Sequence, residues 1–460
     1  MSLQSDRLGV DPVPKLLADL AIPAFIGLFV TGLYNIVDTI FVARGVGTLG
    51  VAGASIAFPV QMIISSLAGA LGIGGASVIS RRLGANNKKE ADQAFGNVLG
   101  LLLLLSLSGI LLAFSTLTPL LRLFGASDTI MPYARDYLGI ILYGTLFFAF
   151  LFCMNNIVRA EGNAKTAMTA MLVSAILNII LDPIFIFKLG MGIKGAALAT
   201  VLSQVTSAVY LSIYFFSGKS VFSFKMANLR PELSLVKEIV AIGSSAFVRL
   251  SSMSITLVVA NNMALLYGGD MAVAIFGIIH KVMMFFVMPI NGVVQGLLPV
   301  AGYNYGAEQH ERVSQSTLLA LKAASLIAAT GFLIVMLFPR QIMLIFTNDT
   351  AVIEAGLSAL RIIFALSFTI GVPIINSGVF QALGYAKEAL LLSMSRQVLF
   401  LIPLLVVLPL IFGLQGVWMS FPAADLLSLL LALWFIKKYR SIFFLTRSPK
   451  KAAEEVASNV

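Results

Sequence analysis

Residues 21–44 read AIPAFIGLFVTGLYNIVDTIFVAR, and this stretch decides which kind of fold the chain adopts. Within it only Asp38 and the final Arg44 are charged. A helix that crosses a lipid bilayer needs about 20 mostly apolar residues. The stretch therefore predicts a membrane-spanning helix that carries one carboxylate inside the apolar layer.

The composition of the whole chain agrees with this interpretation. Of its 460 residues, 59% are hydrophobic and 11% are charged, whereas soluble domains have roughly 45–50% and about 25%. The composition excludes a soluble, disordered or coiled-coil protein, and the single Cys153 excludes a disulfide scaffold. Continuous apolar stretches with 38 glycines favour helices over a membrane β-barrel, whose strands would alternate polar and apolar residues.

Twelve stretches are long and apolar enough to span a bilayer, and the chain is therefore predicted to be an all-α polytopic membrane protein. The predicted spans are 15–44, 50–81, 91–118, 130–158, 165–189, 192–217, 235–265, 271–303, 309–338, 351–381, 386–410 and 414–440.

The basic residues predict the orientation of these helices. Twenty-one Lys and Arg residues fall on the side that holds both termini, and seven fall on the other side. Basic loops remain in the cytoplasm, so both termini are expected there, in a multi-pass protein of a prokaryotic cell (inner) membrane. The net charge of +10 is spread over many short loops, so no nucleic-acid partner is expected.

The two halves of the chain repeat at a fixed offset of 222 residues. Leu83-Gly84-Ala85 recurs as Tyr305-Gly306-Ala307, and Gly162 recurs as Gly384. A constant offset over six helices predicts two six-helix lobes, related by a pseudo-twofold axis along the membrane normal, as in some transporters. A monomer is expected, because one chain supplies both lobes. The predicted parts are an N-lobe at 1–217, a cytoplasmic linker at 218–234, a C-lobe at 235–440 and a cytoplasmic tail at 441–460.

Three acidic residues are expected deep in the membrane: Asp38, Asp182 and Asp425. A charge at the bilayer centre costs at least roughly 2.5–3.5 kcal/mol, so such residues are usually functional or paired. At 1.5 Å per residue, Asp38 and Asp182 both lie roughly 12–13 Å from the outer ends of their helices. They are therefore predicted to share a level in the N-lobe.

Polar residues at helical spacing extend this pair into a pocket. Asn178 lies one turn before Asp182, and Thr200 lies at a similar depth on the next helix. The same faces continue with Ser174 and Gln204. Two carboxylates in a low dielectric do not both remain charged, and one H⁺ or one Na⁺ held with Asn178 and Thr200 would relieve them. The alternative is a buried polar cluster that only fastens helices together.

Two prolines are predicted to let the helices around this pocket bend, because proline removes a helical hydrogen bond. They are Pro23 and Pro183, which directly follows Asp182. The C-terminal half has no such acid pair, since Ala260 stands at the position equivalent to Asp38 and Pro403 at the position equivalent to Asp182, where the offset slips by one residue to 221. There Arg396 and Asp425 are predicted to form a structural ion pair.

A substrate surface is predicted around the pocket. Tyr34 lies one turn from Asp38, and methionines adapt to ligands of varied shape. The candidate contacts are Tyr34, Asn155, Met168, Met171 and Gln204. Neither a metal site nor a catalytic triad is expected, because the chain has two histidines and one cysteine without ligand spacing. The chain is therefore not expected to be an enzyme or to carry a cofactor.

Four motifs in order resemble the multidrug and toxic compound extrusion (MATE) family over nearly the whole chain. They are Tyr34-Asn35-Ile36-Val37-Asp38, Arg82-Leu83-Gly84-Ala85, Arg159-Ala160-Glu161-Gly162-Asn163-Ala164-Lys165, and Asn178-Ile179-Ile180-Leu181-Asp182-Pro183 leading to Gly195-Ala196-Ala197-Leu198-Ala199-Thr200. The resemblance implies a twelve-helix, two-lobed exporter of cationic or amphipathic organic compounds, driven by entry of H⁺ or Na⁺.

Within that family the pattern is similar to the prokaryotic DinF-like branch, which carries its essential carboxylates in the N-lobe. Another branch carries acids in helices 7 and 10, where this sequence has Arg249 and Asn376. The resemblance thus implies a multidrug efflux antiporter coupled through Asp38, Asp182, Asn178 and Thr200. A flippase for lipid-linked precursors, which has a related fold, is the alternative, and the choice between H⁺ and Na⁺ stays open.

Overall fold

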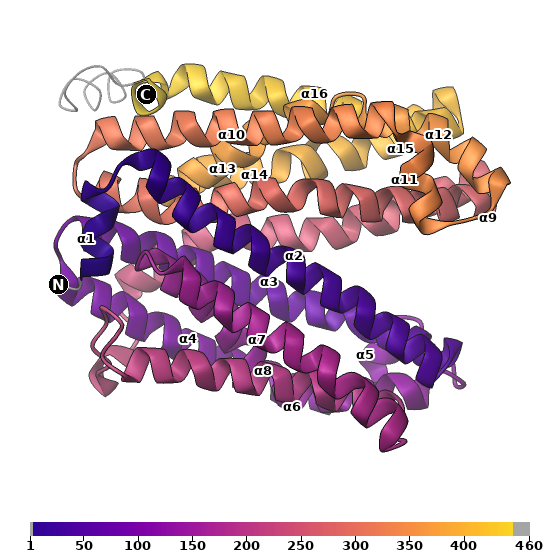
Figure 1. Ribbon diagram of the computed structural model, residues 1–460, viewed down its shortest axis with the longest axis horizontal. Helices are drawn as coiled ribbons and strands as arrows, with labels where there is room; N and C mark the ends of the chain where they lie inside the picture. The colour runs from indigo at the N-terminus through magenta and orange to yellow at the C-terminus, as the bar shows by residue number, and fades with distance from the viewer. Residues whose placement is uncertain (1–2, 445–460) are drawn as a thin grey trace.

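The computed structural model of the chain is described for residues 3–444, and these fold into helices joined by short turns (Figure 1). The first half contains α1 (Leu3–Val10), α2 (Val13–Gly45), α3 (Thr48–Gly84), α4 (Lys88–Ser115), α5 (Leu117–Leu123), α6 (Met131–Ala160), α7 (Ala164–Pro183) and α8 (Ile193–Phe216). The second half contains α9 (Leu233–Gly306), α10 (His310–Leu337), α11 (Pro339–Phe346), α12 (Thr350–Phe364), α13 (Gly371–Leu383), α14 (Ala386–Met394), α15 (Ile402–Phe412), α16 (Leu414–Lys438) and α17 (Arg440–Phe443).

The long helix α9 contains two membrane spans. Its backbone leaves helical geometry at Gly269, where φ is 66° and ψ is −165°. Glycine adopts this left-handed backbone without the steric cost that a side chain would bring. With α9 counted as two spans and with α12 and α13 as two parts of one, the described helices make up the predicted twelve.

The predicted tenth span, 351–381, is broken rather than continuous. Helix α12 ends at Phe364, a short 3₁₀ turn covers Ser367–Thr369, and α13 starts at Gly371. A Cβ on Gly371 would lie 2.9 Å from the backbone of Ala324, so this turn packs directly against α10. Hydropathy does not reveal such a break, because both sides of it are apolar.

Two six-helix lobes make up the molecule (Figure 1). In that view α3 to α8 form the lower lobe, the helices from α10 to α16 form most of the upper lobe, and α2 runs alongside α7 and α9. Helices α3 and α9 share the largest contact between elements. The two ends of the chain lie at the same end of the molecule, which we call the terminal end.

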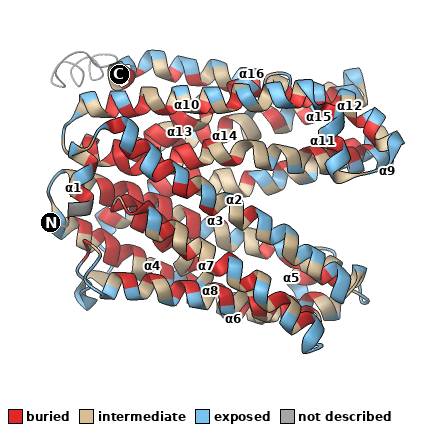
Figure 2. Ribbon diagram, in the orientation of Figure 1, coloured by how far each residue is buried: buried red, intermediate tan, exposed pale blue. Residues whose placement is uncertain are grey.

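Burial follows the lobes. Figure 2 shows buried residues inside each lobe and where the lobes meet near the terminal end. Helix α4 instead exposes a row of leucines, among them Leu104, Leu107 and Leu111, which are 61%, 52% and 72% exposed. An apolar row of this kind suits the hydrocarbon of a bilayer and would be unfavourable in water.

At the terminal end the lobes meet backbone to backbone. A Cβ on Gly84 would overlap the carbonyl oxygen of Tyr303, and a Cβ on Gly306 would overlap that of Arg81. Gly84 and Gly306 are equivalent in the 222-residue repeat, as are Arg81 and Tyr303. The contact is therefore pseudo-symmetric, and only glycine permits it.

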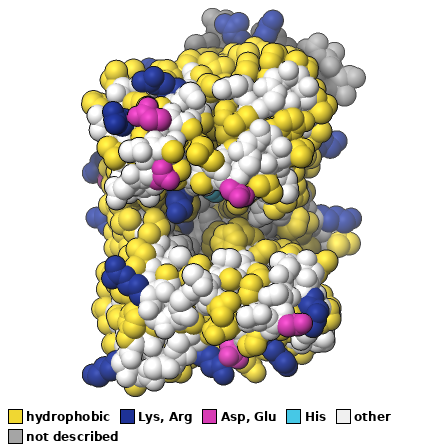
Figure 3. All heavy atoms as spheres, turned by 90° about the vertical axis from the view of Figure 1, so that its right-hand side faces the viewer, with side chains coloured by type: hydrophobic (Ala, Val, Ile, Leu, Met, Phe, Trp, Pro, Cys, Tyr) yellow, Lys and Arg dark blue, Asp and Glu magenta, His cyan; other side chains and the backbone are white. Residues whose placement is uncertain are grey.

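The opposite end of the molecule is open. Figure 3 looks onto that end and shows a hollow between the upper and lower lobes. The structure therefore has the lobes joined at the terminal end and separated at the other.

Candidate functional site

Asp182 and Asn178 lie on one face of α7, and both are buried, with 0% and 1% of their surface exposed. The side-chain amide of Asn178 donates a hydrogen bond to Oδ1 of Asp182 at 3.4 Å and another to Oγ1 of Thr200 on α8 at 3.2 Å. The spacing i, i+4 on one helix brings Asn178 and Asp182 together. The packing of α7 on α8 brings Thr200 to them. These three predicted residues therefore form one cluster.

Asp38 joins this cluster from α2, which packs along α7. Its carboxyl lies close enough to the carboxyl of Asp182 for the two groups to interact electrostatically. Two carboxylates are acceptors only, so a hydrogen bond between them requires a proton on one of them. The geometry thus suits a site that holds a proton between two acids.

Three oxygen atoms of the cluster are buried without a hydrogen-bond partner: Oδ1 of Asp38, Oδ1 of Asn178 and Oδ2 of Asp182. An unpaired buried oxygen costs about 1–3 kcal/mol, so it is a place where a proton or a cation is bound favourably. Among residues 3–444, no Lys, Arg or His forms an ion pair with Asp38 or Asp182.

Glycines allow α2 and α7 to approach each other around the acids. A Cβ on Gly27 would lie 2.7 Å from the sulfur of Met171, and one on Gly45 would overlap Ile186. Past Pro183 the helix widens into a π-helical turn over Ile184–Lys188. Proline cannot donate the usual backbone hydrogen bond, which accounts for the change from α-helical to π-helical hydrogen bonding there. Pro23 is buried inside α2.

Tyr137 and Gln61 belong to the site and were missed by the sequence analysis. Tyr137 of α6 is 6% exposed and lies within electrostatic range of Asp38, and the side chain of Gln61 of α3 lies near its hydroxyl. A buried tyrosine needs a partner for its hydroxyl, which is the one general signal that could have drawn attention to it. No spacing rule connects helices so far apart in the sequence.

The predicted substrate residues lie in different surroundings. Tyr34 is half-buried and within electrostatic range of both Asp38 and Asp182. Met168, Met171 and Gln204 are half-buried as well. The structure therefore brings Tyr34 directly to the acid cluster.

Asn155 is turned toward its own lobe. It is 3% exposed, its amide donates to the carbonyl oxygen of Ala167 at 2.8 Å, and its oxygen accepts from Arg159. It thus joins α6 to α7.

The C-lobe contains the predicted ion pair in place of an acid pair. Nε of Arg396 lies 2.6 Å from Oδ1 of Asp425, and Asp425 is only 2% exposed. A buried carboxylate with a guanidinium at this distance is neutralised without a further ion. Asn376 donates to the carbonyl oxygen of Ala432 and joins α13 to α16.

Comparisons with known proteins agree with these features. The MatE family model matches residues 23–184 and 241–407. The multidrug export protein MepA of Staphylococcus haemolyticus (strain JCSC1435) is 27% identical over 429 residues, which cover 93% of this chain and 94% of MepA.

Solved structures are similar over almost the whole chain. The MATE multidrug transporter DinF-BH superposes with a TM-score of 0.90 at 49% identity, covering 97% of this chain and 100% of that one. An outward-facing multidrug resistance MATE transporter of the MOP superfamily superposes with a TM-score of 0.90 at 30% identity, covering 96% and 99%.

Proposed function

Because the chain belongs to the MATE family, in its DinF-like branch, we propose that it exports cationic or amphipathic organic compounds in exchange for H⁺ or Na⁺. Members of this family are transporters and not enzymes. The observation that supports the proposal is the pair formed by the half-buried Asp38 and the buried Asp182, which has no basic partner among the described residues.

In this proposal Asp38, Asn178, Asp182 and Thr200 bind the coupling ion. A proton between the two carboxyls, or Na⁺ among their oxygens, removes a negative charge from a low-dielectric site. The site is reached from the open end, where the ion would enter. Binding then changes the packing of α2 on α7, and the prolines Pro23 and Pro183 supply places where these helices bend.

We place the substrate in the hollow between the lobes. Tyr34 links it to the ion site, since it stands one turn from Asp38 on the same helix. The further candidate contacts are Met168, Met171 and Gln204, whereas Asn155 would act only through its contact with α7. Neutralisation of the acids would weaken the attraction for a bound organic cation, which couples ion entry to substrate release.

The orientation belongs to the proposal as well. The 21-to-7 distribution of basic residues supports a cytoplasmic terminal end and an outward-facing hollow. The parts of the transporter are the N-lobe at 1–217, the linker at 218–234, the C-lobe at 235–440 and the tail from 441, all in one monomeric chain without a cofactor.

Proteoliposomes containing the purified chain test the function. Uptake or release of ethidium is followed while a pH gradient and a Na⁺ gradient are imposed separately. We expect one of the two gradients to drive transport. We expect Asp38→Asn to slow transport at least tenfold, because the neutral amide of Asn cannot take up a proton and lacks the negative charge that attracts Na⁺.

Asp128→Asn is the matched control, because Asp128 is an exposed acid whose one ion pair among the described residues is with Arg122 at 3.0 Å. It should transport like the unaltered chain. Gradient-driven efflux by Asp38→Asn at the unaltered rate would overturn the assignment of the ion site. Lipid movement without any gradient-driven dye transport would instead favour the flippase.

A further inference from the structure

We propose that a hollow at the terminal end of α16 binds an anionic phospholipid of the cytoplasmic leaflet. Leu433, Ile436, Lys437, Arg440 and Phe444 line this hollow, which has a volume of about 440 Å³. The proposal rests on the orientation given above but not on the ion site or on the transported compound.

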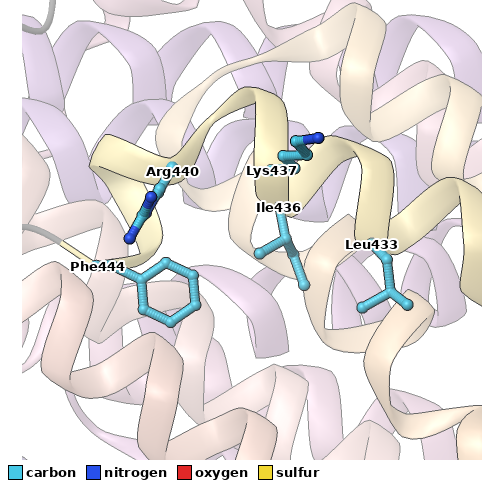
Figure 4. Close-up of a pocket in the computed structure, with 5 residues that line it drawn as sticks. All are labelled: Leu433, Ile436, Lys437, Arg440 and Phe444. Carbon is cyan, nitrogen blue, oxygen red and sulfur yellow. The ribbon is translucent and has the colours of Figure 1, made fainter.

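One side of the hollow is apolar. Figure 4 shows Leu433 and Ile436 projecting from the last turns of α16 toward the same side, with Phe444 beyond them. Leu433 and Phe444 are each 47% exposed. Acyl chains would cover this surface, and each buried CH₂ contributes about 0.8 kcal/mol.

The lining of the hollow also contains two cations, Lys437 and Arg440. Among residues 3–444, neither Lys437 nor Arg440 forms an ion pair or a side-chain hydrogen bond. The nearby Glu388 already accepts a hydrogen bond from the hydroxyl of Tyr439 at 2.5 Å. Lys438 is placed elsewhere, with its ammonium 5.4 Å from the ring centre of Trp434.

The position in the membrane selects a lipid as the occupant. Helix α16 is one of the apolar spans and ends at Lys438, so the two cations stand where the hydrocarbon meets the headgroups. The sequence continues with Arg447, Lys450 and Lys451, which makes six basic residues from Lys437 onward. Basic clusters directly cytoplasmic of a transmembrane helix attract anionic lipids at about 1 kcal/mol per residue.

A second hollow, at the open end, provides a contrast. It has a volume of about 520 Å³, and Tyr143, Arg135, Asp136 and Lys194 are among its lining residues. There Nζ of Lys194 lies 3.4 Å from a carboxylate oxygen of Asp136. An acid inside the lining partly neutralises the bases, whereas no acid is among the described residues that line the hollow at α16.

The bound lipid would stabilise the corner between α16 and α17. Phe443, which is fully buried, accepts a hydrogen bond at its carbonyl oxygen from Ser314 of α10 at 2.8 Å. Lys437 lies in the last turn of α16 and Arg440 begins α17, with Tyr439 between the two helices. A headgroup that binds both Lys437 and Arg440 would therefore join the two helices at this corner.

The chain contains a reporter for this site. Its two tryptophans are Trp418, which is 2% exposed in the C-lobe core, and Trp434, which is 52% exposed beside Leu433. In the full chain carrying Trp418→Phe, fluorescence comes from Trp434 alone. The protein is titrated in mixed micelles with phosphatidylglycerol or phosphatidylcholine brominated on the acyl chains, since bromine quenches tryptophan only at short range.

We expect half-maximal quenching at a roughly tenfold lower mole fraction of the phosphatidylglycerol than of the phosphatidylcholine. The double variant Lys437→Ala, Arg440→Ala should remove that preference, and Lys437→Arg should keep it. The matched control Lys88→Ala, Lys89→Ala removes the same charge at the start of α4 and should also keep it.

Equal quenching by both lipids would overturn the proposed site. An equal loss of the preference for phosphatidylglycerol in the two double variants would overturn it as well. Soluble glycerol phosphate is added in a separate arm at millimolar concentration. Unchanged quenching supports a lipid as the ligand, while full competition would show a site for free phosphate esters and would overturn the lipid assignment.

Discussion

Glu161 shows at the scale of one residue how a buried acid is accommodated outside the membrane spans. It follows α6, is fully buried, and accepts hydrogen bonds from the backbone N–H of Val221 at 2.8 Å and from the hydroxyls of Ser220 and Tyr214. Burial raises the pKa of Glu161 to about 7, although these hydrogen bonds to the carboxylate oppose that rise. The residue fastens the segment after α8 to the end of α6.

This pKa predicts a pH dependence of stability. The folded state keeps the proton of Glu161 up to about pH 7, whereas the unfolded chain releases it near its ordinary value of 4.5. The stabilisation is therefore fully present below pH 4.5 and is lost as the pH rises through 7, by an amount on the order of 3 kcal/mol at most.

Thermal unfolding of the detergent-purified chain between about pH 5 and pH 8 measures this effect. We expect the melting temperature to fall with rising pH, and to fall less in Glu161→Gln, which does not titrate. Asp128→Asn should follow the unaltered chain, because that acid is exposed. The same slope in Glu161→Gln would contradict the prediction.

At the scale of elements, the crossing of α3 and α9 closes the terminal end. Gly84 on α3 and Gly306 on α9 each face a carbonyl oxygen of the other helix. Near them Oγ of Ser77 donates to the carbonyl oxygen of Gln381 at 2.5 Å, which joins α3 to α13. A side chain at either glycine forces the crossing apart.

Gly84→Ala is predicted to loosen this crossing. Its Cβ would overlap the carbonyl of Tyr303, so the state with the terminal end closed loses stability relative to one with that end open. A cysteine introduced as Ser77→Cys, at a position that is 2% exposed, should react with a water-soluble thiol reagent at least about fivefold faster in this variant. The native Cys153 gives no background, because it is fully buried.

Gly109→Ala is the matched control, since a Cβ there meets no atom within 4 Å. It should leave the labelling rate of Ser77→Cys unchanged. An unchanged rate in Gly84→Ala as well would show that the crossing does not control access from the terminal end.

At the scale of the whole molecule, one carboxylate links the two lobes. Glu238 on α9 lies 2.8 Å from Nη1 of Arg81 and 3.0 Å from Nη2 of Arg82, both on α3. Arg82 also pairs with Glu90 at 2.7 Å. These charges are partly exposed, so each pair contributes only about 1 kcal/mol or less. The pairs act together, however, on the equilibrium between the states with the terminal end closed and open.

Glu238→Gln is predicted to increase the population that is open at the terminal end by about fivefold, because it removes roughly 1 kcal/mol from the closed state. Hydrogen–deuterium exchange in the segment 77–84 should become faster by a similar factor. Glu311→Gln removes an exposed carboxylate that accepts only from Gln315 and should have no effect on that segment. Equal exchange in both variants would contradict the role of Glu238.

Both lobes are fastened in a similar way at their terminal ends. Tyr214, at the end of α8, donates to Glu161, and Tyr439, after α16, donates to Glu388. In the N-lobe the last helix is thus joined to the turn after the fourth span, and in the C-lobe the residue after the last helix is joined to the first turn of α14, which follows the fourth span. This similarity is consistent with the 222-residue repeat, although the residues do not align one to one.

Much of this architecture could be predicted from the sequence alone. The length of the apolar stretches predicted the spans, and the constant offset predicted two lobes. Both properties follow from the order of residues along the chain and do not depend on tertiary contacts. The spacing of Asn178 and Asp182 placed them on one helix face, and the common depth of Asp38 predicted that it would meet them. Arg396 and Asp425 were found in the same way.

Only the tertiary structure revealed what depends on how helices cross. Tyr137 and Gln61 reach the acid cluster from α6 and α3, and no periodicity relates them to Asp38. The break before Gly371 and the contacts of Gly84 and Gly306 arise from backbones that touch in space. The sequence by itself therefore determined which stretches are apolar enough to span a membrane and how far each residue lies from the ends of its helix, since hydropathy and helical rise are local properties. The packing decided which of them meet, because that depends on the angle and distance between helices.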